Sequence, residues 1–194
     1  MDKPLYLYIG PSGCGKTTIT ELLESMYGYK AIKSYTTRTP RYEGENNHIF
    51  ITEEEFDKLE NLVAYTLYNG CKYGTTKEQL DNADLYVLDI PGLETLLQNY
   101  ANTERKTYVF YLDSTVRTRI DRMTDRHDSD AEIIKRLYND EAFDWFRKLD
   151  HIEWHYKHIE HRDIELYKIN ADENIENVLA QVLYYMKPQK DKGE

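Results

Sequence analysis

GPSGCGKTT, from Gly10 to Thr18, is the stretch that decides the fold. It matches G-x-x-x-x-G-K-[ST] in full, after a short apolar run at 5–9 and before a segment with helical periodicity at 17–28. In this pattern, glycines let backbone N–H groups turn inward around a phosphate, and the next helix adds the positive end of its dipole. Lys16 can reach the β- and γ-phosphates, and Thr17 can ligate Mg²⁺. The stretch therefore predicts a nucleotide-binding phosphate loop made by Gly10, Pro11, Ser12, Gly13, Cys14, Gly15, Lys16, Thr17 and Thr18.

The segments around this loop alternate between buried-type strands and helices. Apolar strands are expected at 5–9, 85–90, 106–112 and 164–169, and helices at 17–28, 93–101 and 173–186. This alternation implies right-handed crossovers and a parallel sheet. We expect an α/β chain of the P-loop NTPase type, with three layers around a central parallel sheet.

Two segments interrupt the alternation. Residues 34–80 form short polar–apolar stretches broken by glycine and proline, which predicts a small β-rich lobe; its one helix begins at a capping box of Thr52 and Glu55. Residues 114–160 are charged and helix-forming.

Length and charge narrow the function further. A chain of 194 residues suits one domain, and a net charge of -10 argues against coating nucleic acid or an anionic membrane. The two cysteines suggest free thiols in a reducing compartment, and no signal or membrane-spanning segment is found. We therefore expect a cytoplasmic protein.

Asp89 closes the apolar run at 85–89 and is the expected acidic partner of the loop. It would position Mg²⁺ together with Thr17, directly or through water. The segment D-I-P-G at 89–92 also fits the D-x-x-G of GTPase switches. The later N/T-K-x-D segment that reads guanine in those proteins is absent, so a GTPase switch is the weaker alternative.

A second anion site is indicated by an uneven distribution of charge. From Ser25 to Tyr42 there is no acidic residue, although Lys30, Lys33, Arg38 and Arg41 fall there. Within this stretch, SYTTRTPRYEGE from Ser34 resembles the S-x-T-T-R-x-P-R-x-G-E segment of guanylate kinases. The resemblance continues through YGTTKEQL at 73–80, VLDI at 87–90 and RMTDRHDSDAEIIKRL at 122–137.

The resemblance implies phosphoryl transfer from ATP, with Mg²⁺, to a nucleoside monophosphate such as GMP or dGMP. It assigns the acceptor phosphate to Ser34, Arg38, Arg41 and Tyr73, with His48 and Thr75 nearby. Catalytic roles would fall to Lys16, Arg38, Arg122, Arg126 and Arg136, the last three on a lid, and Asn170 would lie near adenine. The implied single domain, 1–194, comprises a core (1–32, 83–113, 163–194), an acceptor lobe (33–82) and a lid with an extended helical insertion (114–162).

The chain departs from the guanylate kinase pattern where the base is read. Ala64 stands where the family has a glutamate, and Pro91 replaces or deletes its second aspartate; His48 replaces a tyrosine. Guanine presents N1–H and N2–H donors, which carboxylates read naturally. Ribose 1,5-bisphosphate phosphokinases, which read no base, are therefore an alternative. Non-catalytic guanylate-kinase-like modules are a further one, but they characteristically lose the phosphate loop.

The connection from Arg136 to Asn170 is also longer than in the family. His151, His155, His158 and His161 recur there at helical spacing. An amphipathic helix with a polar histidine face is the simpler interpretation than a metal site, because neither cysteine nor an E-x-x-H pattern is nearby. Its aromatics, including Trp145 and Trp154, could form a dimer contact or cover the active site.

Overall fold

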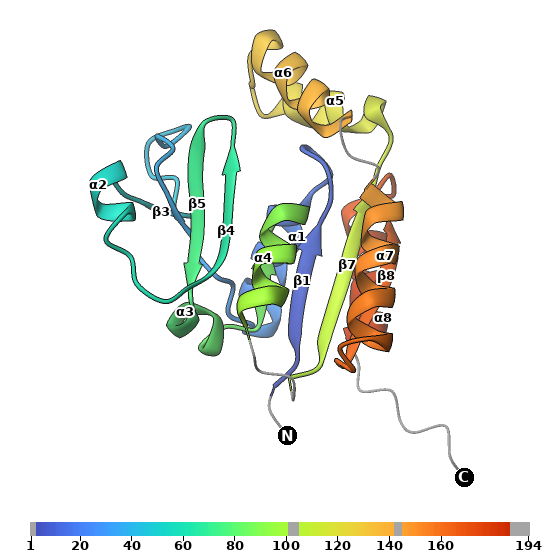
Figure 1. The fold of residues 1–194 in the computed structure, drawn as a ribbon. Helices are drawn as coiled ribbons and strands as arrows, with labels where there is room; N and C mark the ends of the chain where they lie inside the picture. Colours follow the sequence, from blue (N-terminus) through green and yellow to red (C-terminus); the bar gives the residue numbers. More distant parts are fainter. Residues whose placement is uncertain (1–2, 101–104, 142–144, 187–194) are drawn as a thin grey trace.

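A four-stranded parallel sheet forms the centre of the protein, which is described here from a computed structural model covering residues 3–100, 105–141 and 145–186 (Figure 1). The strand order is β6-β1-β7-β8, and every pairing is parallel. The strands are β1 (Leu5–Ile9), β6 (Leu85–Val87), β7 (Thr107–Asp113) and β8 (Ile164–Asn170). The predicted parallel sheet is confirmed.

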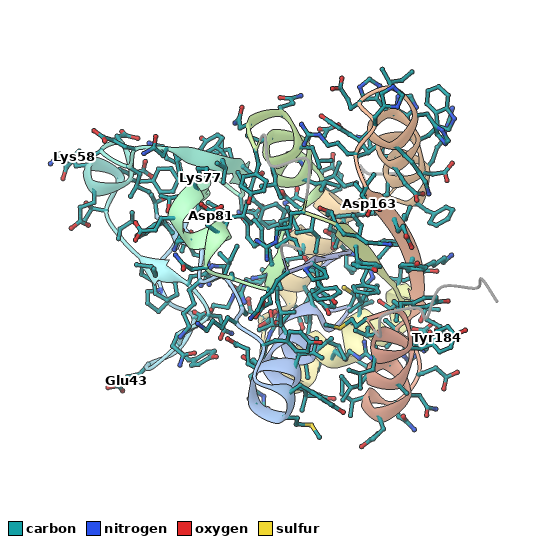
Figure 2. All side chains as sticks on the ribbon, turned by 90° about the horizontal axis from the view of Figure 1, so that it is seen from below. Glu43, Lys58, Lys77, Asp81, Asp163 and Tyr184 are labelled. Atoms are coloured by element: carbon teal, nitrogen blue, oxygen red, sulfur yellow. The ribbon has the colours of Figure 1, made fainter. Side chains whose placement is uncertain are left out.

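Alternating side chains send this sheet's two faces into two separate cores. Leu5, Leu7 and Ile9 pack in one cluster with residues of α4 (Ile90–Asn99) and α7 (Trp145–His158). Tyr6 and Tyr8 pack in the other with residues of α1 (Lys16–Tyr27) and α8 (Ile175–Met186). Viewed from below, α4 and α7 lie on one side of the sheet and α1 and α8 on the other, with Tyr184 on the outer side of α8 (Figure 2). The predicted three layers are present.

Two predicted boundaries are wrong, the end of strand β6 and the start of the helix after it. The strand expected over 85–90 ends at Val87, and α4 begins at Ile90. Asp89 ends the strand because it is the N-cap of α4: its Oδ1 accepts a hydrogen bond from Gly92 N at 2.8 Å. Pro91 fits in the first turn, where a helix needs no N–H donor. The end of the helix predicted over 93–101, Ala101, lies outside the described residues.

The β-rich lobe is a second sheet of order β3-β2-β5-β4 beside the core. Its strands are β2 (Tyr35–Thr36), β3 (Ile49–Phe50), β4 (Leu62–Tyr68) and β5 (Cys71–Thr76). The short helices α2 (Glu53–Phe56) and α3 (Lys77–Asp81) both begin with capping boxes, and that of α2 is the one predicted at Thr52 and Glu55. Strand β4 packs against α4, which joins the lobe to the core.

Residues 114–160 supply three helices with two different locations. Helices α5 (Val116–Asp125) and α6 (Asp130–Glu141) lie beyond the carboxyl ends of β1 and β7 (Figure 1). In contrast, α7 packs on β8 and α4, with Leu149 and Ile152 buried. Helix α7 therefore completes one layer of the core, whereas α5 and α6 lie where the lid is expected. No helix in the described segments is long and apolar enough to cross a membrane.

Leu149→Ala tests whether α7 belongs to the folded core. Leu149 is 1 % exposed, so removing its side chain should lower the free energy of unfolding by about 2–5 kcal/mol. Ile134→Ala on α6 is the control, because Ile134 is 67 % exposed and should cost less than about 0.5 kcal/mol. Urea titration of both variants measures the difference. Equal, small losses would show that α7 is only loosely attached.

Candidate active site

A cleft of about 700 Å³ opens where the core, the lobe and the lid helices meet. This volume suits small-molecule ligands. The phosphate loop and the start of α1 line one part of it. Residues from the lobe and lid line the rest, together with Asp89 and Gly92 at the start of α4. The predicted site residues found in the lining are Gly10, Ser12, Gly13, Cys14, Gly15, Lys16, Thr17, Thr18, Ser34, Arg41, His48, Tyr73, Asp89, Arg122, Arg126 and Arg136.

The phosphate loop has the shape that its glycines predict. Gly13 has a φ of +79°, and a Cβ there would lie 2.8 Å from the carbonyl oxygen of Arg119 on α5. A Cβ on Gly10 would lie 2.7 Å from the carbonyl oxygen of Leu112 on β7. The loop is thus enclosed by β7 and by the lid, with no room for side chains at either contact.

Lys16 and Arg122 hold the loop through its carbonyl groups. The Nζ atom of Lys16 donates to Gly10 O at 2.7 Å and to Pro11 O at 2.9 Å. Arg122 donates from Nη1 to Cys14 O at 3.2 Å and from Nη2 to Ala171 O at 2.8 Å. These bonds place two cations on the loop and attach α5 to it.

Asp89 and Thr17 both place oxygen atoms in the lining of the cleft. Asp89 Oδ2 accepts a hydrogen bond from Thr66 Oγ1 at 2.9 Å, while Oδ1 caps α4. Burial raises the pKa of Asp89, although these hydrogen bonds and the charge of Lys16 oppose the shift. A carboxylate and a hydroxyl are suitable ligands for Mg²⁺, and the remaining lone pairs of Asp89 can reach it directly or through water.

The lobe presents a neutral polar cluster. Ser34 Oγ and His48 Nδ1 are 3.0 Å apart, and the rings of His48 and Tyr73 meet edge to face with centroids 5.6 Å apart. Burial and the charge of Arg38 lower the pKa of His48 to about 4. His48 is therefore neutral near pH 7 and can offer one N–H donor.

Three guanidinium groups gather between the lobe and the lid. Arg41, Arg126 and Arg136 all line the cleft, and burial followed by the charges of Arg136, Arg38 and Arg126 lowers the pKa of Arg41. Asp128 pairs with Arg126 and lies 3.7 Å from Arg136 Nε. Glu45, which pairs with Arg38, lies 4.0 Å from Arg41 Nη1. Counting Arg38, two carboxylates thus partly offset four cations among the described residues, and the cluster favours an anion.

Four predicted site residues lie outside the cleft lining. Pro11 is buried. Arg38 forms a bidentate pair with the buried Glu45, at 2.7 and 3.1 Å. Thr75 is fully buried and donates to the hydroxyl of Tyr86 at 2.8 Å. Asn170 is exposed and bonds to Gln181.

Sequence reasoning missed several residues that line the cleft. Thr66 and Tyr68 share one face of β4, and Tyr68 Oη lies 3.4 Å from Ser12 Oγ. Residues 64, 66 and 68 alternate along the strand and therefore share a face, so the position of Ala64 could have indicated that Thr66 and Tyr68 face the acceptor. Tyr86 and Asp140 line the cleft from distant segments, and no local pattern marked them. Trp145, one of the aromatics considered as a cover for the active site, also lines it.

The histidine-rich insertion shows no metal cluster within the described residues. Helix α7 ends at His158, so His161 falls outside it. His151, His158 and His161 are exposed. Trp145 donates from Nε1 to Asp140 O at 3.1 Å and lines the cleft, whereas Trp154 is exposed on the surface. Residues 142–144 of this insertion lie outside the described residues.

Comparison with known proteins identifies the family. No protein-family model matches the chain. A guanylate kinase of Geobacter sulfurreducens is 30% identical over 148 residues, covering 70% of this chain and 71% of that protein. The chain belongs to the guanylate kinase family. A guanylate kinase of Synechocystis is 33% identical over 147 residues, covering 69% of this chain and 75% of that protein.

A solved structure confirms the fold. The guanylate kinase of Anaplasma phagocytophilum matches with a TM-score of 0.53 and 16% identity, over 96% of this chain and 86% of that one. Membership of the guanylate kinase family makes the chain a nucleoside monophosphate kinase. This supports an enzyme and does not favour the GTPase switch or the non-catalytic module.

Gly13→Ala tests the enclosure of the phosphate loop. The added methyl would overlap the Arg119 carbonyl and strain a positive φ, so the affinity for Mg·ATP should fall by at least about tenfold. Gly44→Ala is the matched control, because Gly44 has a φ of +84° with no atom within 4 Å of its Cβ position. Calorimetric titration measures both. If the two variants bound Mg·ATP equally well, the methyl group at Gly13 would not disturb the loop and the packing argument would fail.

Proposed function

We propose that this protein transfers the γ-phosphoryl group of ATP to the phosphate of GMP or dGMP, giving ADP and the nucleoside diphosphate. The observation that carries the proposal is that two groups of residues suited to binding anions line one cleft. One is the glycine loop with Lys16, and the other is the cluster of Arg41, Ser34, His48 and Tyr73 on the lobe.

The donor would bind with its triphosphate on the loop from Gly10 to Thr18. The backbone amides and the N-terminus of α1 would hold the β-phosphate, and Lys16 would leave the loop carbonyls to contact the phosphates. Thr17 and Asp89 would hold Mg²⁺, which would supply positive charge to neutralise the charge that develops on the phosphoryl oxygens.

The acceptor phosphate would bind between Arg41 and the hydroxyls of Ser34 and Tyr73. Neutral His48 adds an N–H donor without adding charge. Arg38 is paired with Glu45. It would contact the acceptor phosphate directly only if it left Glu45, and otherwise it would act by holding Glu45 in place. Glu45 also accepts from the backbone N–H of Arg41 at 2.6 Å, so Arg38 and Glu45 together orient Arg41.

Transfer needs alignment and charge neutralisation more than acid–base chemistry. The attacking oxygen belongs to a phosphate that is already anionic, so no strong base is required. Arg122, Arg126 and Arg136 would stabilise the transferring group from the lid side. Closure of α5 and α6 over the cleft would exclude water, which would otherwise hydrolyse ATP.

The recognition of the acceptor base is the part of the proposal that the sequence supports least. Ala64 is 1 % exposed and cannot accept a hydrogen bond, and Pro91 lies in the first turn of α4. Guanine would have to be read by other groups, of which the hydroxyls of Thr66, Tyr68 and Tyr86 line the cleft.

Arg41→Ala tests the acceptor site. Removing this guanidinium should raise the KM for GMP by about tenfold or more, because a charge-assisted contact to a dianionic phosphate is lost. The KM for ATP should change by less than about threefold. Arg117→Ala is the control, since Arg117 is exposed and pairs with Asp121 on α5, outside the lining of the cleft. Steady-state kinetics with each substrate varied will decide. A parallel rise in both KM values would place Arg41 on the donor or in the scaffold.

An acceptor panel tests the substrate. ADP release from ATP should be measured with GMP, dGMP, AMP, UMP, dTMP, CMP and ribose 1,5-bisphosphate in parallel, with Lys16→Ala as the inactive control. We expect the highest kcat/KM for GMP or dGMP. Activity restricted to the sugar bisphosphate would replace the proposal by the alternative that Ala64 and Pro91 raise. If none of these acceptors supported ADP release, the proposal would be refuted.

A further inference from the structure

Asp140, near the end of α6, is a buried acid outside the transfer mechanism described above. It is 5 % exposed, and its Oδ2 accepts a hydrogen bond from the backbone N–H of Ser12 at 2.8 Å. The same oxygen receives Arg119 Nη1 of α5 at 3.0 Å. One carboxylate oxygen therefore joins both lid helices to the phosphate loop.

The surroundings of Asp140 make this junction stiff. Arg119 is itself 5 % exposed, and its backbone carbonyl is the atom that closes on Gly13. Trp145 donates to the carbonyl of Asp140. A buried ion pair with additional hydrogen bonds specifies geometry more than it adds stability, because desolvation offsets much of its attraction.

Asp140 lies four residues after Arg136 on the same helix. Residues at this spacing share a helix face, so whatever holds Asp140 against the loop also directs Arg136 toward the cleft. Arg136 does line the cleft; its Nε has no hydrogen-bond partner within the described residues and lies 3.7 Å from Asp128 Oδ2. On the neighbouring residue, the Asn139 amide donates to Asn69 in the lobe, so the end of α6 contacts both the loop and the lobe.

We propose that Asp140 is a positioning residue that fixes the rotation of α6 on the phosphate loop and so holds Arg136 at the phosphoryl group. The inference rests on the proposed transfer reaction. In this arrangement the carboxylate of Asp140 on α6 accepts a hydrogen bond from the backbone N–H of Ser12 in the phosphate loop. The effect on turnover should therefore pass through Arg136.

A double-mutant cycle with Arg136 tests this route. Asp140→Ala should lower kcat by about tenfold with a change in the KM for ATP of less than about threefold. In an Arg136→Ala background, the same substitution should lower kcat by less than about twofold, because the group it positions is gone. Asp140→Asn keeps an oxygen acceptor for Ser12 and should retain more activity than Asp140→Ala. Asp130→Ala, in the exposed first turn of α6, is the control.

A second variant guards against misfolding. Removing Asp140 leaves Arg119 buried without its partner, so Arg119→Leu with Asp140→Leu removes both charges together. This pair should fold, as judged by its thermal transition, and still show the loss of kcat. Full activity in the pair, or an equal loss from Asp140→Ala in both Arg136 backgrounds, would overturn the inference. Failure of the proposed function would look different, since the wild-type protein would then transfer to no acceptor.

Discussion

The contact between the phosphate loop and its two neighbours is the constraint on which the other features depend. Side chains are excluded at Gly10 by β7 and at Gly13 by α5, so the loop amides stay in place between the sheet and the lid. The cleft forms because β1 delivers the loop to the carboxyl edge of the sheet, where open α/β sheets bind their ligands. At this edge, Asp89 reaches the cleft from beyond the end of the neighbouring strand β6, and Arg122 reaches it from α5. The lobe borders the cleft on the side of α4.

The charge distribution follows from the same arrangement. The chain has a net charge of -10, yet cations concentrate around the cleft. Asp89, Asp125 and Asp140 are the acids that line the cleft within the described residues. Two further acids, Glu45 and Asp128, are each paired with arginines near the cleft, and each has a lowered pKa. These acids hold the guanidinium groups in position without neutralising the cluster. An acid-rich surface around a basic cleft also limits binding of extended polyanions while admitting a small one.

The sequence predicted the sheet and the loop well because their signals are local. The apolar runs, the glycines and the lysine lie within single elements, and the Thr52 capping box lies within four residues. The strand at 85–90 was overextended because Asp89 has two roles, as cleft residue and as N-cap, and the cap decides where the helix begins. Thr75 and Asn170 were expected in the site on the resemblance alone, and Arg38 on the resemblance and the local excess of cations. The packing around Glu45, Tyr86 and Gln181 decided their positions. Tyr86 and Asp140 could not be predicted, since only tertiary folding brings β6 to β5 and α6 to the loop.

The central claim is that one water-excluding cleft passes a phosphoryl group directly between two bound phosphates. The most direct test is to supply ATP labelled with phosphorus-32 at the γ-position together with unlabelled GMP, and to separate the products. Label should appear on the terminal phosphate of GDP in a one-to-one ratio with ADP, with little inorganic phosphate. Label released mainly as inorganic phosphate, at a rate independent of GMP, would show hydrolysis and contradict the account.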